Sequence, residues 1–182
     1  EPTAFQSAGG ASLTKLDDNS LLVSGKVPAS DSYEVTLGIP AKTVTAVRLE
    51  ALTHESLPHK GPGLAGNGNF VLTDIQFRSA VEGVDDDRLA IASAFADHSQ
   101  PKYPVQNAFD GDAAQSGWAI NQPPDGKLNA NRTAVFVLKE PLPTNSAPFI
   151  VELRHAHANR YNLGRFRLSI TSADPSAFEL SP

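Results

Sequence analysis

An Asp-Gly-Asp turn precedes the only tryptophan of the chain in the stretch NAFDGDAAQSGWAI, residues 107–120. Calcium takes about six to eight oxygen ligands from carboxylates, backbone carbonyls and hydroxyls. Asp110 and Asp112 offer carboxylates. Ser116 offers a hydroxyl and a carbonyl, and Ala108 or Asn107 offers a further carbonyl. The glycine between the two acidic residues lets the backbone turn around an ion. The stretch therefore predicts a calcium site.

A second interpretation of the same stretch needs no metal. In an Asx turn, the carboxylate of Asp110 accepts hydrogen bonds from nearby backbone amides and fixes the loop that carries Trp118. Trp118 then either packs in the core or offers its ring to a ligand, and we expect core packing. The residues alone leave both interpretations of the acidic turn open.

A second group of candidate residues lies in HAHANRY, residues 155–161. If a strand continues through this stretch, His155 and His157 point to the same face, because alternate residues do so. Two imidazoles can begin a zinc site, but no third ligand is evident. The stretch also suits a sugar-binding lip, where rings stack on a sugar and polar groups meet its hydroxyls. An ordinary exposed hairpin is the third interpretation.

We predict that HAHANRY and the glycine-rich HKGPGLAGNGN, residues 59–69, form a ligand-facing rim, because together they hold three of the five histidines. Stacking needs a ring, and the hydroxyls of a sugar need short polar partners. The predicted carbohydrate-binding residues are His59, Asn67, His155, His157, Asn159, Arg160 and Tyr161.

Two motifs that superficially match enzyme signatures fail on their context. GPGLAG at 61–66 has the spacing of a dinucleotide motif, but Pro62 and a following Asn-Gly-Asn turn stand where that motif opens a helix. HESLPH at 54–59 separates its histidines by five residues and contains Pro58, whereas a zinc-protease helix needs a separation of four. No serine stands in a nucleophile elbow. We predict no catalytic residues and no enzymatic activity.

Composition narrows the class of protein and of partner. The chain has 182 residues and a formal charge of −5 with scattered basic residues, which argues against nucleic acid as a partner. It has no cysteine, hence no disulfide and no thiolate site, and no methionine, which suggests a segment processed from a longer protein. No run approaches the roughly 18 apolar residues of a membrane span.

The elements that must position these residues are predicted to be strands. Val, Ile, Thr and Phe alternate with polar residues in short segments, as on half-buried pleated surfaces. These segments are 20–25, 33–39, 43–52, 69–80, 89–96, 133–138, 149–156 and 164–172. We expect an all-β fold, an antiparallel β-sandwich of jelly-roll type with about eight or nine strands, as one domain over 1–182. Two small β-domains divided near residue 82 are the alternative.

The stretch YPVQNAFDGDAAQSGWAI, residues 103–120, resembles discoidin or coagulation-factor type C domains, a galactose-binding-like group. The matching residues are Ala108, Phe109, Asp110, Gly111, Ser116 and Trp118. The resemblance covers about twenty residues, with one extra residue between turn and tryptophan. It implies a buried tryptophan and a calcium site completed by an acidic residue from a late strand, Glu152 or Glu179.

A second resemblance covers most of the chain. The stretches GPGLAGNGNFVLTDI and LGRFRLSIT are similar to a domain of large exported planctomycete proteins that also carry cytochrome-c-like domains. In that context the domain is regarded as a carbohydrate-binding-like module. We therefore expect a non-catalytic polysaccharide- or oligosaccharide-binding module of a secreted, periplasmic or cell-surface bacterial protein. The alternative is a structural or interaction domain that packs against neighbouring domains of its parent.

Overall fold

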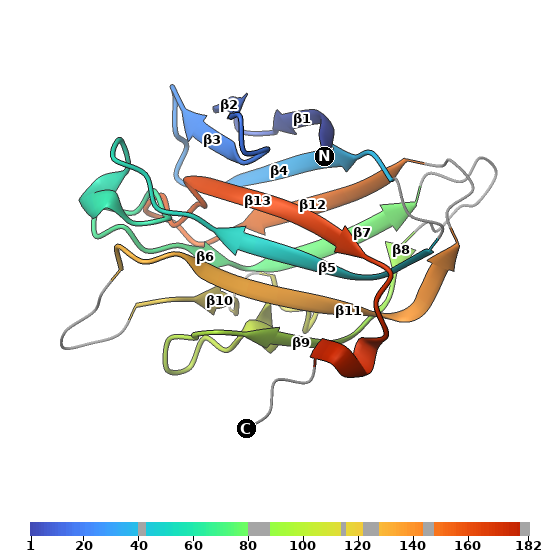
Figure 1. Ribbon diagram of the computed structural model, residues 1–182. Coiled ribbons are helices and arrows are strands. Elements are labelled where there is room, and N and C mark those ends of the chain that lie inside the picture. The colour runs from blue at the N-terminus through green and yellow to red at the C-terminus, as the bar shows by residue number, and fades with distance from the viewer. Residues whose placement is uncertain (40–42, 80–87, 114–115, 122–127, 144–147, 179–182) are drawn as a thin grey trace.

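Two antiparallel sheets face each other in the computed structural model of the chain (Figure 1). The structure describes residues 1–39, 43–79, 88–113, 116–121, 128–143 and 148–178. Within these residues there is no α-helix, only three short 3₁₀ helices. The expectation of an all-β, antiparallel sandwich is confirmed, while the jelly-roll connectivity stays a prediction.

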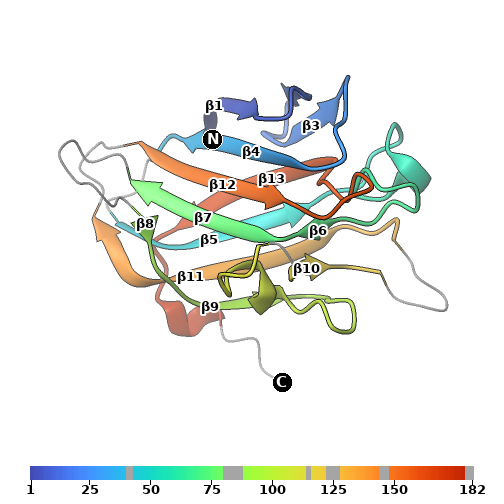
Figure 2. The ribbon, with the colours of Figure 1, turned by 180° about the vertical axis from the view of Figure 1, so that it is seen from behind.

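The first sheet has five strands and lies nearer the viewer in Figure 2. In order they are β1 (Pro2–Ser7), β4 (Asp31–Leu37), β12 (Phe149–His155), β7 (Asp74–Ser79) and β8 (Arg88–Leu89). The second sheet has six: β2 (Ser12–Lys15), β3 (Leu21–Ser24), β13 (Arg165–Thr171), β5 (Thr43–Ala51), β11 (Arg132–Pro143) and β9 (Ile91–Ala96). In each sheet, a strand from the end of the chain lies between strands from its first half: β12 between β4 and β7, and β13 between β3 and β5.

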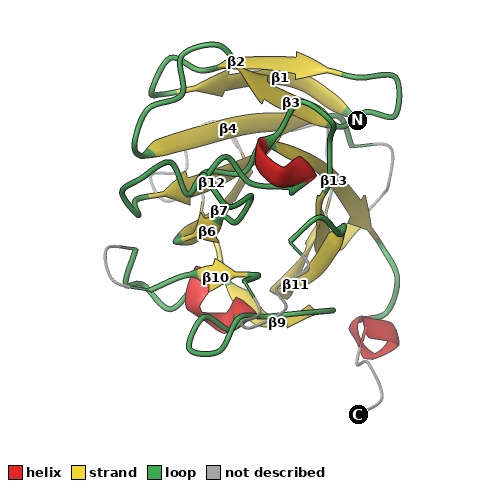
Figure 3. Cartoon of the chain, turned by 90° about the vertical axis from the view of Figure 1, so that its left-hand side faces the viewer, coloured by secondary structure: helices red, strands yellow, loops and turns green. Residues whose placement is uncertain are grey.

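A third, two-stranded sheet and three 3₁₀ helices complete the fold. Strands β6 (Val71–Leu72) and β10 (Trp118–Ala119) pair with each other beside the main sheets (Figure 3). The 3₁₀ helices are η1 (Pro58–Lys60), η2 (Val105–Ala108) and η3 (Pro175–Phe178). No helix in the described ranges is long and apolar enough to cross a membrane.

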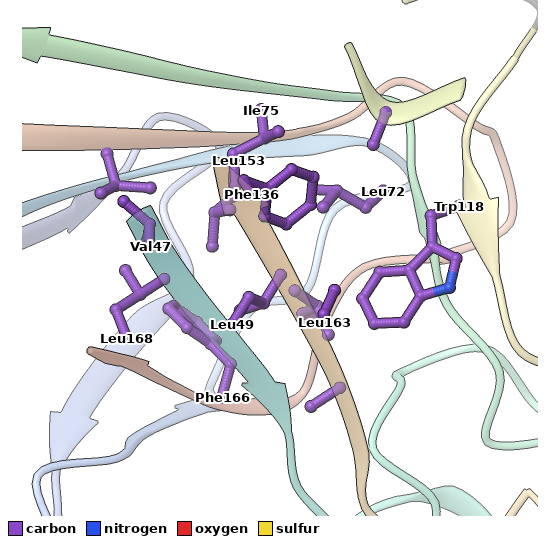
Figure 4. Packing of buried hydrophobic residues seen from close by; sticks show 14 of the residues in the cluster. Val47, Leu49, Leu72, Ile75, Trp118, Phe136, Leu153, Leu163, Phe166 and Leu168 are labelled. Atoms are coloured by element: carbon purple, nitrogen blue, oxygen red, sulfur yellow. The ribbon is translucent and has the colours of Figure 1, made fainter. Parts of the chain in front are cut away.

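The core lies between the two sheets and follows from strict alternation. Strands β4 and β12 bury every second residue. Rings meet across the gap between the sheets: Tyr33 stacks on Phe166 at a centroid distance of 5.7 Å, and Phe77 meets Phe136 edge-on at 6.2 Å. Figure 4 shows Phe136 and Phe166 among the aliphatic side chains. Burying each such ring contributes roughly 1.5–3 kcal/mol.

The structure departs from the predicted strands at a few places. Strands β1 and β2 were outside the predicted segments. Both strands are short and mostly exposed, so they show little of the alternation between apolar and polar residues on which the prediction rests. The prediction also ended one strand at residue 138, whereas β11 continues to Pro143. It does so past a register shift between Val137 and Leu142 that accommodates Pro141.

Candidate functional site

The loops that carry most of the candidate residues meet at one end of the sandwich. There β5 and β12 end, β13 begins, and η1 lies beside them (Figure 3). The loop 156–164, which joins β12 to β13, is anchored to its surroundings by backbone hydrogen bonds. Val71 donates to the carbonyl of Tyr161 at 2.8 Å, and Arg160 donates to that of Ala29 at 3.0 Å. The loop therefore holds its side chains in fixed positions.

Three partly exposed rings gather at this end. The ring of His157 lies 5.9 Å from that of Tyr161, with an interplanar angle of 77°, and 6.2 Å from that of Tyr103, at 63°. All three side chains are of intermediate exposure. We call Tyr103, His157 and Tyr161 the ring cluster. Such a cluster offers ring faces and edges together with two phenol hydroxyls and an imidazole, which suits a ligand with both apolar and polar faces.

The small β6–β10 sheet holds the backbone of the ring cluster through hydrogen bonds. Leu72 and Trp118, paired in register, belong to the main core. Alternation places their neighbours Val71 and Ala119 on the opposite face, where they are 4% and 0% exposed. Their amides donate to the carbonyls of the two tyrosines of the ring cluster, at 2.8 and 3.3 Å. The backbone of both tyrosines is thus hydrogen-bonded to the β6–β10 sheet.

Trp118 packs in the core, as expected, and offers no surface to a ligand. It is fully buried, its indole Nε1 donates to the carbonyl of His98 at 3.0 Å, and its ring meets Phe70 edge-on at 5.1 Å. Figure 4 shows it at the margin of the hydrophobic cluster, beyond Leu163. The indole therefore anchors the end of the sandwich.

His155 occupies a position different from the one the sequence suggested. Strand β12 ends at His155, so the alternation that would place it on one face with His157 does not extend that far. His155 is 0% exposed and packs against Tyr33, at a centroid distance of 4.9 Å. Burial lowers its pKa to about 3, so the imidazole is neutral near pH 7. It belongs to the core rather than to a rim.

The remaining predicted rim residues are exposed side chains on turns. His59, Asn159 and Arg160 adopt left-handed backbone conformations, with φ of 48°, 68° and 62°. Asn67 caps a turn, its Oδ1 accepting from the amide of Asn69 at 3.0 Å. Of the seven predicted residues, the structure therefore brings the rings of His157 and Tyr161 together, and it adds Tyr103 from a distant segment.

The acidic turn has the geometry of an Asx turn. Asp110 Oδ1 accepts from the amide of Asp112 at 2.8 Å, and Oδ2 accepts from the hydroxyl of Ser116 at 2.7 Å. The Ser116 amide donates to the carbonyl of Asp112 at 3.2 Å, and Gly111 has φ of 86°. Both carboxylate oxygens of Asp110 thus accept hydrogen bonds within the loop.

The other predicted calcium ligands are distributed over separate elements. Ala108 is fully buried at the end of η2. Glu152 lies within β12, opposite Glu34 in register, and its carboxylate pairs with Arg154 at 2.7 Å. Glu179 lies outside the described residues. Among the described residues, no group of three or more His, Cys, Asp or Glu side chains is arranged to hold a metal. Calcium binding stays a prediction.

One feature of this end was absent from the sequence predictions. A polar cavity lies between the end of β5, η1 and the start of β13, and Lys60, Glu55 and Arg165 line it. These residues come from segments more than a hundred positions apart. No local spacing marks them, and only the pairing of β5 with β13 brings them together.

Comparison with known proteins found no match to a protein-family model, to a curated protein or to a solved structure.

Proposed function

We propose that this chain is a non-catalytic carbohydrate-binding module of a larger exported bacterial protein, and that the ring cluster receives the sugar. One observation carries the proposal: three partly exposed rings, Tyr103, His157 and Tyr161, pack edge-on at the end of the sandwich. Sugars bind by stacking their C–H faces on aromatic rings while polar side chains meet the hydroxyls.

Two further features support this proposal. The ring cluster is held by backbone hydrogen bonds to β6 and β10, so little order has to be created on binding. Asn159 and Arg160 lie in the same loop as His157 and Tyr161 and are exposed, so their donors and acceptors are open to solvent.

The test is affinity gel electrophoresis against a panel of soluble polysaccharides. The proposal is supported if at least one polysaccharide retards the wild type and retards Tyr161→Ala less. Phe95→Ala is the matched control, because Phe95 is also a partly exposed ring but lies on β9. No retardation by any polysaccharide, or equal retardation of both variants and the wild type, would contradict it.

A specific observation also favours the alternative, a domain that packs against neighbouring domains of its parent. On the outer face of the six-stranded sheet, Phe95 and Val135 stand directly opposite each other, and both are partly exposed. Beside this pair, Val135 also lines a cavity with Ile170 and Phe178, so several apolar side chains gather on this face, as in a surface that contacts another protein. Phe95→Glu should disrupt such a contact and leave polysaccharide retardation unchanged.

A further inference from the structure

A cavity of about 350 Å³ opens at the end of the sandwich that also carries the loop 156–164. It lies between the segment that follows β5, the helix η1 and the start of β13. Its lining residues are Thr53, His54, Glu55, Lys60, Asn129 and Arg165. This volume suits a ligand of the size of one sugar residue or a small acid.

Hydrogen-bond donors dominate the lining. Lys60 offers an ammonium group, Arg165 a guanidinium group and Asn129 an amide. His54 Nδ1 accepts from the amide of Ser56 at 3.2 Å, which fits the tautomer with its proton on Nε2. A cavity lined in this way is complementary to a ligand that presents acceptors.

The only carboxylate in the lining, that of Glu55, already occupies the position on Lys60 that a ligand carboxylate would take. Glu55 Oε2 lies 2.8 Å from Lys60 Nζ, and this bond raises the pKa of Lys60. The two side chains are 81% and 61% exposed. An ion pair so exposed contributes little to stability. A ligand carboxylate can therefore replace Glu55 on the ammonium group at small cost.

The guanidinium of Arg165 is held in place before any ligand arrives, and so is the backbone of Lys60. Three hydrogen bonds orient the guanidinium of Arg165: Nε to the Ser20 hydroxyl, Nη1 to the Thr53 carbonyl and Nη2 to Asp18, at 2.8–3.0 Å. Lys60 has a left-handed backbone, with φ of 57°, and its amide donates to the Leu57 carbonyl at 2.9 Å. Such backbone strain in a non-glycine residue persists only where surrounding contacts fix it.

We propose that this cavity binds the carboxylate of a uronate, with Lys60 as the principal contact and Arg165 and His54 as further donors. The carboxylate part of this assignment rests on the cavity alone, and the sugar part rests on the proposed function. Glu55 acts as an internal competitor for Lys60. The module would then select acidic over neutral polysaccharides.

Galacturonate, galactose and acetate are the probes, each titrated into the protein and followed by backbone amide chemical shifts. Galacturonate should bind at least about tenfold more tightly than galactose, because a charge-assisted pair is lost in the neutral sugar. Lys60→Gln should weaken galacturonate binding about tenfold, while Lys60→Arg retains most of it. Glu55→Gln should strengthen binding several-fold. Lys139→Gln, the same change on exposed β11, is the matched control.

The results separate this inference from the proposed function. Equal affinity of the wild type and Lys60→Gln for galacturonate, or equal affinity for galacturonate and galactose, would overturn it. Acetate binding as tightly as galacturonate would overturn the sugar part. If Tyr161→Ala loses polysaccharide retardation but still binds galacturonate through Lys60, both proposals stand. If the wild type binds galacturonate but no polysaccharide retards it in the gel, only the proposed function of the ring cluster fails.

Discussion

The ring of His157 stands edge-on to the ring of Tyr161, with centroids 5.9 Å apart and planes at 77°. The two residues are four positions apart in one loop, and the loop carbonyl at Tyr161 is fixed by the amide of Val71. The orientation of the imidazole therefore depends on the tyrosine. His157→Ala and Tyr161→Ala should each weaken polysaccharide binding by about tenfold, with a combined effect smaller than the sum, because the rings share one contact.

That prediction is checked by a double-mutant cycle on gel retardation constants, with melting temperatures measured in parallel. Both side chains are only partly buried, so the melting temperature should change little. Strict additivity of the two losses would contradict a shared contact.

Burial of His155 predicts a loss of stability in acid. Its pKa is about 3 in the folded state and near 6.5 in the unfolded chain. Since the folded pKa is the lower one, its contribution to stability is present above about pH 6.5 and is lost as the pH falls toward 3. Each unit of difference is worth about 1.4 kcal/mol, so the total reaches several kcal/mol.

The measurement is the free energy of unfolding by urea at a series of pH values from 7 to 4. His155→Leu has a similar volume and no titrating group, so its stability should fall less steeply over this interval than that of the wild type. Equal slopes for the two proteins would show that another group governs the acid sensitivity.

Two glycines of the 59–69 loop should respond differently to alanine. A Cβ at Gly63 would overlap the backbone carbonyl of Asn69, whereas a Cβ at Gly66 meets nothing within 4 Å. Gly63→Ala should therefore cost about 1–3 kcal/mol, and Gly66→Ala should stay within about 0.5 kcal/mol of the wild type. Thermal unfolding of both variants tests this, and similar losses would mean that the loop tolerates displacement at Gly63.

The two interpretations of the acidic turn predict different metal responses. As an Asx turn, Asp110 stabilises the loop through two hydrogen bonds, so Asp110→Ala should cost about 1–2 kcal/mol in chelator and in calcium alike. A calcium site would instead stabilise the wild type by roughly 2.7 kcal/mol at a hundredfold excess over the dissociation constant. Melting curves of metal-stripped protein, with and without millimolar calcium, distinguish the two.

The sandwich could be predicted from the sequence because its central strands alternate so regularly. Segments such as 149–156 and 164–172 show which residues face the core without any knowledge of their partners. His155 is buried in phase with Val151 and Leu153, so alternation within this strand places it in the core. Its assignment to the rim was wrong because it assumed that the strand continues to His157, whereas β12 ends at His155. At that end of the strand, the buried imidazole packs against the ring of Tyr33.

The candidate site was predictable only in its local part. His157 and Tyr161 share one loop, so their proximity could be expected from their spacing. Tyr103 reaches them only because β6 pairs with β10. The cavity beside Lys60 escaped prediction altogether, because Arg165 arrives there through the pairing of β13 with β5. Long-range pairing of this kind leaves no mark in the spacing of residues.

The short ladder between β6 and β10 determines how stably the rings of the ring cluster stay together in solution. With two residue pairs, it is the smallest sheet of the fold, yet it links Tyr103 to Tyr161 through the amides of Val71 and Ala119. A transient opening of this ladder would carry Tyr103 away from its partners while the main sheets stay closed. Binding across the rings therefore couples to a local opening equilibrium, and a bound ligand would slow hydrogen exchange at those two amides before it changed exchange in the sandwich core.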